Sequence, residues 1–261
     1  AVISHAVTKG VDADVAMKDS GLEWLGEVPA HWSRPKKLDH VSEAKKNSFV
    51  NGPFGSDLLS IELQSEGVRV IYIRDLKLDG YTNVSGVYVT PEKAEELRFC
   101  NVLPGDVLIA KVGDPPGLAT TYPENEPGAI VTQDVIRLRV SGSETDPKFI
   151  VHLLNSSVGR YAVDQIAVES TRVRVSLGDY KQLRFCLPPV REQQSIARFL
   201  DKKSKSIATT IDDSTQTIGL LKERRSALIS AAVTGKIDLR DWQPPSSKTF
   251  PDSFVSEGAP P

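Results

Sequence analysis

The chain has 261 residues and a formal net charge of −2, with 32 Lys and Arg against 34 Asp and Glu. Hydrophobic residues make up 39% and charged residues 25%, which is ordinary for a globular protein with a core. No stretch approaches the ~20 uninterrupted apolar residues of a membrane-spanning helix, and no charged start leads into an apolar secretory signal. Two cysteines are too few for a disulfide framework or a four-ligand zinc site. Composition therefore indicates the cytoplasm and nothing further.

Charge is unevenly distributed along the sequence. Residues 34–190 hold 19 basic and 20 acidic residues, a net charge of −1, whereas residues 191–240 hold ten basic and six acidic residues, a net charge of +4. A basic segment of this kind is compatible with a nucleic acid or with an acidic protein partner, and it selects neither.

An internal repeat relates the two ends of the chain. AVISHAVTKGVD at residues 1–12 and ALISAAVTGKID at residues 227–238 share seven identities without a gap, although two Ala- and Val-rich helix ends could also resemble each other by chance. Two copies so far apart suggest a parent built from two similar units. We therefore expect residues 1–17 to be the end of a preceding conserved helix with its linker, and the sequence to be the second half of a longer protein.

Residues 18–190 have the pattern of an α+β domain. The loop that opens it carries Trp24 and Trp32, which look exposed. Five β-branched or alternating runs, bounded by Gly, Pro and Asp turns, predict strands at 68–73, 84–89, 106–112, 134–140 and 183–188. Helical patterns interrupt them at about 91–99 and 147–166, the second with Asp146 as cap and Pro147 in the first turn. We predict a β-rich domain with a bent, mainly antiparallel sheet.

Residues 191–240 predict one long helix, because no proline occurs between 191 and 243. Steps of three and four residues give an apolar stripe typical of a coiled coil. The expected helix–helix interface consists of Leu200, Ile207, Ile211, Ile218, Leu221 and Leu228. Since such a helix cannot bury its stripe alone, we predict self-association into a dimer. The Pro- and Ser-rich residues 241–261 are expected to be a disordered tail.

No catalytic, metal or cofactor site is predicted. The four histidines show no metal-ligand spacing, and neither a phosphate-binding glycine loop nor a Gly-x-Ser-x-Gly elbow occurs. Residues 114–117, Asp-Pro-Pro-Gly, resemble the Asp-Pro-Pro-aromatic loop that holds a flipped adenine in amino-methyltransferases. Gly117 replaces the aromatic residue and a methyl-donor site is missing, so we interpret this segment as a turn.

Six motifs occur in an order that carries a family resemblance: KDSGLEWLGEVPAHW (18–32), NGPFGSDL (51–58), LPGDVLIAKVG (103–113), STRVRVSL (170–177), LPPVREQQSIARFLD (187–201) and LLKERRSALISAAVTGKIDLR (220–240). Together they resemble the DNA-specificity subunit of type I restriction-modification systems, over about residues 18–240. The last two motifs are the most specific ones.

The resemblance implies two target-recognition domains, each followed by a long conserved helix. The two helices would pack antiparallel, and each domain would read one half of a split double-stranded DNA site. It also implies a subunit without catalysis or cofactor, on which methyltransferase subunits dock and which nuclease subunits join. This sequence departs from the pattern, because it has one recognition domain and almost none of the first helix. It is either a cut C-terminal half or a natural half-subunit.

Loops of such a domain should reach base edges in the major groove, while other side chains grip phosphates. We expect the polar loop around Thr171, Arg172 and Arg174 to face DNA, although these arginines could merely solvate a strand edge. Weaker candidates are Lys45, Lys46, Arg74, Lys111, Gln133 and, for a phosphate, Ser56. In NGPFGSDL we predict a tight turn at Gly52-Pro53 and Gly55, with Phe54 anchored in the core.

A protein-interaction scaffold, with a β-rich binding domain and an oligomerising helix, is the alternative function. DNA reading predicts a salt-dependent affinity that falls when Arg172 and Arg174 become Ala, whereas a scaffold predicts no such dependence. The basic face of the helix is a candidate dock for the methyltransferase, or a solvated face: Lys202, Lys203, Lys205, Arg224 and Arg225.

Overall fold

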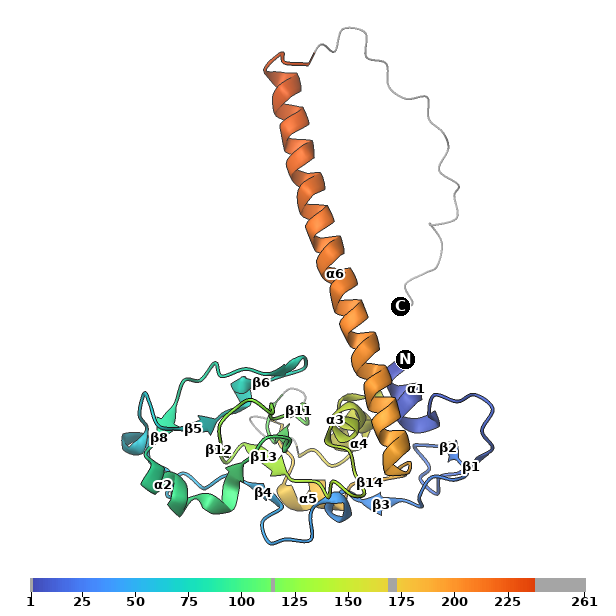
Figure 1. Ribbon diagram of the computed structural model, residues 1–261, viewed down its shortest axis with the longest axis vertical. Coiled ribbons are helices and arrows are strands. Elements are labelled where there is room, and N and C mark those ends of the chain that lie inside the picture. The colour runs from blue at the N-terminus through green and yellow to red at the C-terminus, as the bar shows by residue number, and fades with distance from the viewer. Residues whose placement is uncertain (1, 114–115, 169–172, 238–261) are drawn as a thin grey trace. The chain divides into compact units, whose positions relative to one another are not determined.

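The computed structural model describes residues 2–113, 116–168 and 173–237 (Figure 1). The chain divides into two compact units, Ala1–Ser204 and Lys205–Pro261. Among the described residues, we find no helix whose length and apolarity would let it cross a bilayer.

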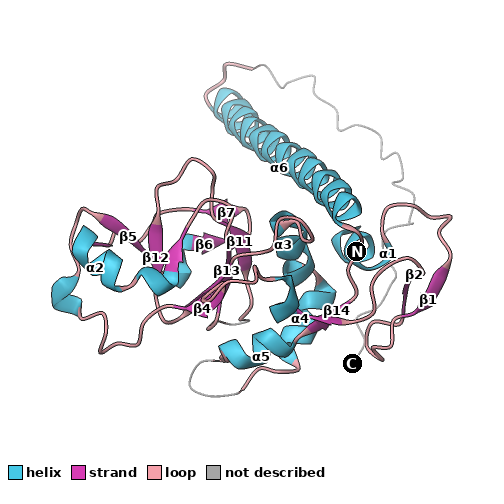
Figure 2. Ribbon diagram, turned by 60° about the horizontal axis from the view of Figure 1, so that its bottom comes forward, coloured by secondary structure: helices cyan, strands magenta, loops and turns pink. Residues whose placement is uncertain are grey.

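Two four-stranded sheets form the β-structure of the first unit (Figure 2). The first sheet is antiparallel throughout, in the order β11 (Ala119–Thr121), β10 (Val107–Ala110), β13 (Val135–Leu138), β4 (Phe49–Asn51). The second has the order β8 (Tyr88–Val89), β5 (Val68–Ile71), β12 (Ala129–Val131), β9 (Asn101–Val102). In the second sheet β5 and β12 run parallel, while the other neighbours are antiparallel. The mainly antiparallel α+β prediction is confirmed, with two sheets in place of one.

Shorter elements complete this unit. Three two-stranded ribbons pair β1 (Met17–Asp19) with β2 (Glu27–Pro29), β3 (Lys36–Lys37) with β14 (Arg184–Phe185), and β6 (Leu76–Lys77) with β7 (Gly80–Tyr81). The 3-10 turns are η1 (Leu38–Val41), η2 (Ser60–Glu62), η3 (Ile73–Asp75) and η4 (Arg98–Cys100). The short helices are α2 (Pro91–Glu96), α3 (Pro147–Asn155), α4 (Ser157–Asp164) and α5 (Leu177–Gln182).

The predicted helix over 147–166 is two helices. Asp146 caps the first as expected, because its Oδ1 accepts the N–H of Phe149 at 2.9 Å. Ser156 breaks the run: its backbone is extended (φ −70°, ψ 162°) and its hydroxyl accepts the N–H of Gly159, which starts α4. Asn155, at the end of α3, exchanges two hydrogen bonds with the backbone of Ala119, so α3 is fixed to the edge strand β11.

The hydrophobic core of the first unit has two parts. The larger part joins one face of the first sheet to α3, α4, α5 and the beginning of α6, and the smaller part lies between the other face of the first sheet and the second sheet. Trp32, which looked exposed in the sequence, belongs to the larger core with 2% of its surface exposed. Its indole N–H donates to Oε1 of Glu192 at 3.0 Å, so the polar tip of the ring is paired.

The two segments of the repeat are helix ends. α1 spans Val2–Lys9 and buries Ala6 and Val7, and α6 spans Val190–Val233. The long helix thus begins one residue earlier and ends seven residues earlier than predicted, while residues 238–261, including the expected tail, lie outside the described part. Both helix ends are followed by a glycine with positive φ, Gly10 and Gly235, where an L side chain would be strained.

The predicted helix stripe needs one correction. Leu200 is 1% exposed and packs in the core of the first unit with Ile196 and Ala197, so it is not available to a partner helix. Leu200 is buried because the first turns of α6 pack into the domain core. In the second unit, side chains of the stripe are between 51% and 59% exposed: Ile207, Ile211, Ile218, Leu221 and Leu228.

Candidate functional site

Strand directions bring five segments to one edge of the first unit. β10 and β4 both run antiparallel to β13, so the ends of β10 and β4 lie beside the beginning of β13. The parallel strands β5 and β12 end at the same edge of the second sheet, and the chain passes directly from β12 to β13. We call this edge the loop edge and define it as residues 51–57, 72–74, 111–113, 132–134 and 173–175.

Backbone hydrogen bonds hold the loop edge together. Thr132 donates its N–H and its hydroxyl to the carbonyl of Ile71, at 3.0 and 2.9 Å, and its own carbonyl accepts the N–H of Gly52 at 3.1 Å. Lys111 donates its N–H to Asp134 and accepts the N–H of Val175, at 2.8 and 3.1 Å. Because each loop is bonded to its neighbour, their side chains are presented from a fixed framework.

Three of the predicted DNA contacts meet at this edge. Arg174 is exposed, and Lys111 and Gln133 are partly exposed. Arg174 pairs with Val112 and with Val168, and the bridge to Val168 closes the base of the polar loop predicted to face DNA. The predicted contacts Thr171 and Arg172 lie outside the described residues.

Arg74 extends the polar surface toward the second sheet. It lies just beyond β5, where its Nε donates to the hydroxyl of Ser85 at 2.7 Å and its guanidinium lies 5.1 Å from the ring centroid of Tyr72. Burial raises the pKa of Tyr72, so this phenol stays neutral at physiological pH. These contacts fix the position of the guanidinium of Arg74, a predicted candidate, at the loop edge.

The turn that contains Ser56 also lies at the loop edge, and it corrects the prediction for Phe54. Phe54 is 63% exposed and is not a core anchor. Burial falls instead on Gly52 and Pro53 before it and, partly, on Leu58 after it, which leaves the turn between them in solvent. Sequence reasoning missed this residue because an aromatic in a tight turn is more often a packing residue.

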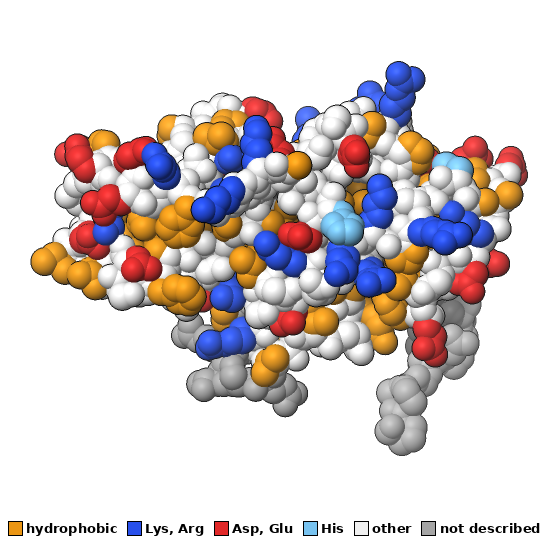
Figure 3. Space-filling view, turned by 90° about the horizontal axis from the view of Figure 1, so that it is seen from below, with side chains coloured by type: hydrophobic (Ala, Val, Ile, Leu, Met, Phe, Trp, Pro, Cys, Tyr) orange, Lys and Arg blue, Asp and Glu red, His pale blue; other side chains and the backbone are white. Residues whose placement is uncertain are grey.

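Lys45 and Lys46 lie elsewhere. The segment that holds them adjoins the far end of β13, where Arg139 exchanges backbone hydrogen bonds with Glu43 and Ser48. Exposed or half-exposed cations gather on this part of the molecule, which Figure 3 views from below. We call it the basic surface and define it as Lys36, Lys37, Lys45, Lys46, Lys181 and Arg184. Two acidic neighbours are already paired, Asp39 with Lys181 and Glu43 with Lys45.

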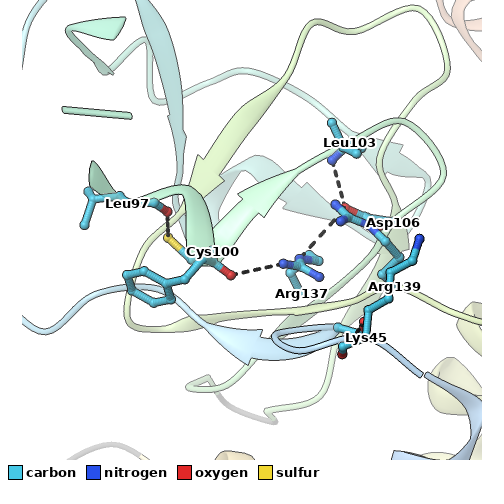
Figure 4. A network of polar contacts seen from close by, with 9 residues as sticks. Lys45, Leu97, Cys100, Leu103, Asp106, Arg137 and Arg139 are labelled. Carbon is cyan, nitrogen blue, oxygen red and sulfur yellow. Dashed lines mark hydrogen bonds and ion pairs between the residues drawn. The ribbon is translucent and has the colours of Figure 1, made fainter. Parts of the chain in front are cut away.

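A buried polar cluster lies between the two sheets (Figure 4). Asp106, 3% exposed, accepts two hydrogen bonds from Arg139 at 2.8 and 2.7 Å and one from the N–H of Leu103 at 2.8 Å. Arg137 donates to the carbonyl of Phe99 at 3.2 Å. Burial raises the pKa of the neighbouring Cys100 thiol to about 11, so it is not a nucleophile at neutral pH.

Metal binding finds no support in the part of the chain that the structure describes, because nowhere in it do three or more His, Cys, Asp or Glu side chains come together as ligands. The segment 114–117 is described from Pro116 onward, and Gly117 has a φ of +91°. Its neighbour Pro116 is fixed by the guanidinium of Arg160, which donates to the Pro116 carbonyl at 2.7 Å. This geometry is that of a glycine turn next to the loop edge.

A β-rich α+β domain followed by a long helix is the architecture that the motifs predict for a DNA-specificity subunit of type I restriction-modification systems. The chain belongs to that family: the model of the type I restriction modification DNA specificity domain matches residues 76–218. The family expected from the sequence motifs is thus confirmed.

Curated relatives carry the same description. The chain is 23% identical over 195 residues to the putative type I restriction enzyme MjaX specificity subunit of Methanocaldococcus jannaschii, covering 71% of this chain and 42% of the relative. It is 28% identical over 178 residues to the type I restriction enzyme EcoBI specificity subunit of Escherichia coli, covering 68% of this chain and 35% of the relative. The chain therefore spans less than half the length of these relatives.

Solved structures support the fold. A chain from structural work on complex assembly and conformational transition of the type I R-M system aligns with a TM-score of 0.62 and 19% identity, over 88% of this chain and 50% of that one. The HsdS subunit of Thermoanaerobacter tengcongensis aligns with a TM-score of 0.57 and 19% identity, over 90% of this chain and 51% of that one.

Proposed function

We propose that this chain is a non-catalytic DNA-reading unit of a type I restriction-modification complex and reads one half of a bipartite target. The observation that carries the proposal is the meeting of Lys111, Gln133 and Arg174 at the loop edge, on loops that are bonded to one another. Base readout needs polar side chains held in a fixed arrangement on a surface that can enter a groove.

The side chains at the loop edge match known base partners. A Gln amide can pair with the N6 and N7 atoms of adenine, and Arg or Lys can pair with O6 and N7 of guanine. We assign Gln133 and Arg174 to base edges, and we keep Thr171 and Arg172, which lie outside the described residues, as DNA-contact candidates. Each well-formed bidentate contact contributes about 1–3 kcal/mol of discrimination against the wrong base. Ser56, Arg74 and Lys111 complete this surface.

The basic surface fits a second role. Its six cations lie away from the loop edge, on β3, α5, β14 and the segment before β4. Phosphate contacts fix the register of a protein on DNA without reading sequence. We therefore assign Lys45 and Lys46 to phosphates. Their loss should weaken binding to all sequences alike and reduce the salt dependence of the affinity.

The long helix supplies the partner interface in this proposal. Its exposed stripe would pack against a second helix, which in this chain by itself means self-association into a dimer. The exposed basic residues Lys202, Lys203, Lys205, Arg224 and Arg225 would dock methyltransferase subunits, which nuclease subunits join. Such a complex would act in the cytoplasm, on chromosomal DNA.

Genome-wide adenine methylation tests the whole proposal. In a strain whose methylation depends on this chain, the combined change of Gln133 and Arg174 to Ala should alter or abolish one half of a bipartite methylated motif. Arg98→Ala is the matched control, because Arg98 is an exposed cation on η4 that does not belong to the loop edge and that pairs at the surface with Glu95. The other half of the motif should stay unchanged in both strains.

A salt titration of DNA binding separates this function from the scaffold alternative. The affinity should fall as salt rises, with a slope set by the number of neutralised phosphates. Arg174→Ala should weaken binding to the selected sequence, and Arg98→Ala should not. Binding that is independent of salt and equal in both variants would favour a protein-interaction scaffold.

A further inference from the structure

An aromatic ring, that of Phe54, is largely exposed at the loop edge. Phe54 is 63% exposed and lies in the turn that follows β4, two residues beyond the hydrogen bond from Gly52 to Thr132. Gln133, which follows Thr132 in the chain, is one of the base-reading candidates. The ring thus belongs to the same surface as the polar readers.

The turn that presents Phe54 is fixed on both sides. Gly52 approaches the β12 end so closely that a Cβ atom there would lie 2.0 Å from the carbonyl oxygen of Val131. Within the turn, Asp57 donates its N–H to the carbonyl of Phe54 at 2.8 Å, and the next residue, Leu58, packs against the smaller core. An exposed ring on such a turn loses little further conformational entropy when it binds.

Charge and chemistry favour a base contact over a phosphate contact. Asp57 places a carboxylate next to Ser56, and the hydroxyl of Ser56 faces that carboxylate at 3.5 Å. A phosphate would be repelled there. A phenyl ring donates no strong hydrogen bond, and on a base edge in the major groove its favourable partner is the 5-methyl group of thymine.

We propose that Phe54 is a specificity residue that packs on the 5-methyl group of one thymine in the major groove. The inference rests on the proposed DNA-reading function and adds one base identity to it. It also explains why an apolar ring lies among side chains suited to polar readout. Removing Phe54 should affect a single base position and leave phosphate contacts unchanged.

Single exposed hydrophobic residues are common on protein surfaces, so exposure alone does not mark Phe54 as a DNA contact. Its position at the loop edge is what separates it from other exposed apolar residues. Ile61 offers the comparison: it is 88% exposed on η2, in the same connection between β4 and β5. It lies toward the far end of the second sheet, where Glu62 pairs with Lys93 of α2 at 2.9 Å and Gln64 bridges Tyr88. Ile61 therefore serves as the control for loss of an exposed apolar side chain.

The experiment uses the full chain and a library of random DNA duplexes. Selection defines the motif that the unmodified protein prefers, and each thymine of that motif is then replaced by uracil, which removes only the methyl group. At one position the unmodified protein should lose about fourfold in affinity, the factor expected for burial of one methyl-sized group. Phe54→Ala should lose affinity for the thymine duplex by a similar factor and should no longer respond to uracil.

The controls keep the result decisive. Phe54→Leu should retain part of the response to uracil, Ile61→Ala should retain all of it, and the salt dependence should be the same in every variant. Two outcomes overturn the role of Phe54 while DNA reading stands. Either replacement by uracil changes the affinity at no position of the motif, or the loss of affinity on replacement persists in Phe54→Ala. Failure of the unmodified protein to select any motif would reject the proposed function together with this inference.

Discussion

Gln193 is hydrogen-bonded to Asp146, since its amide oxygen accepts the backbone N–H of Asp146 at 2.9 Å. The amide nitrogen of Gln193 donates to the carbonyls of Glu144 and Pro188, at 3.1 and 2.8 Å. One side chain that is 1% exposed thus ties the first turn of α6 to the N-cap of α3. The helix begins at a defined place on the domain because all the polar atoms of this amide are paired.

Gln193→Leu should lower the free energy of unfolding by about 2–4 kcal/mol, because buried backbone groups lose their partners. Urea denaturation measures the difference. Gln194→Leu is the matched control on the same turn, where the side chain is exposed. Equal stability of the two variants would show that the Gln193 contacts do not fix the helix base.

Asp201 gives the anchoring of α6 a pH dependence. Partial burial acts to raise the pKa of Asp201, but hydrogen bonds from His152 and Lys148, at 2.8 and 3.1 Å, outweigh it and hold the pKa below its ordinary value. A carboxyl whose pKa is lowered by folding stabilises the fold above its unfolded pKa of about 3.9, and this stabilisation is lost as the pH falls through the folded value.

Asp201→Asn should therefore destabilise the protein at neutral pH and lose its effect in acid. Because the side chain is 42% exposed, solvent screening limits the difference to less than about 1 kcal/mol. Thermal unfolding from pH 7 down to pH 3 tests this, with Asp212→Asn, exposed on the same helix, as the comparison. A difference that grows toward low pH would contradict the assignment.

Gly52 and Gly55 form a matched pair within one turn. A Cβ atom on Gly52 would lie 2.0 Å from a backbone oxygen, whereas one on Gly55 would meet nothing within 4 Å. Gly52→Ala should cost more than about 2 kcal/mol of stability or displace the turn, and Gly55→Ala should leave stability within about 0.5 kcal/mol. Denaturant unfolding and DNA binding of both variants provide the readout, and equal behaviour would contradict the close approach.

Local patterns in the sequence predicted much of the fold. All five strand runs contain strands, and the Asp146 cap forms as expected, because side-chain alternation and capping act between residues close in the chain. The parallel pairing of β5 with β12, and the hydrogen bonds of Gln193 with Asp146 and Glu144, join residues about fifty to sixty positions apart. Such contacts leave no local signal.

The candidate site was predictable in its residue types and not in its arrangement. Lys111, Gln133 and Arg174 were candidates by chemistry, but only the strand order shows that they share an edge and that Lys45 and Lys46 do not. The same limit explains Leu200 and Phe54. Both predictions use only the neighbouring residues in the sequence. The burial of Leu200 is decided by the domain core around the base of α6, and the exposure of Phe54 by the approach of Gly52 to β12.

The Asp106 cluster predicts opposite effects for its two arginine partners. In the part of the chain that the structure describes, Nε and Nη1 of Arg137 form no hydrogen bond, and burial lowers the pKa of this guanidinium to about 10. Arg137→Met should therefore leave stability unchanged or raise it, since an incompletely paired buried charge is costly. Arg139→Met removes a bidentate partner of buried Asp106 and should cost about 3 kcal/mol. Equal losses in the two variants, measured in urea, would contradict this.

Self-association through α6 is the last prediction. Ile211 and Leu221 lie on the predicted stripe and are 59% and 58% exposed, so a second copy of the helix would bury both. A charge at either position would have to enter that apolar contact, and Ile211→Glu should convert a dimer to a monomer in sedimentation experiments at micromolar concentration. Leu220→Glu is the control, because Leu220 is 60% exposed on the same helix and lies off the stripe. A dimer that is broken equally by both changes would place the contact on another face of the helix, and an unmodified chain that stays monomeric would exclude self-association.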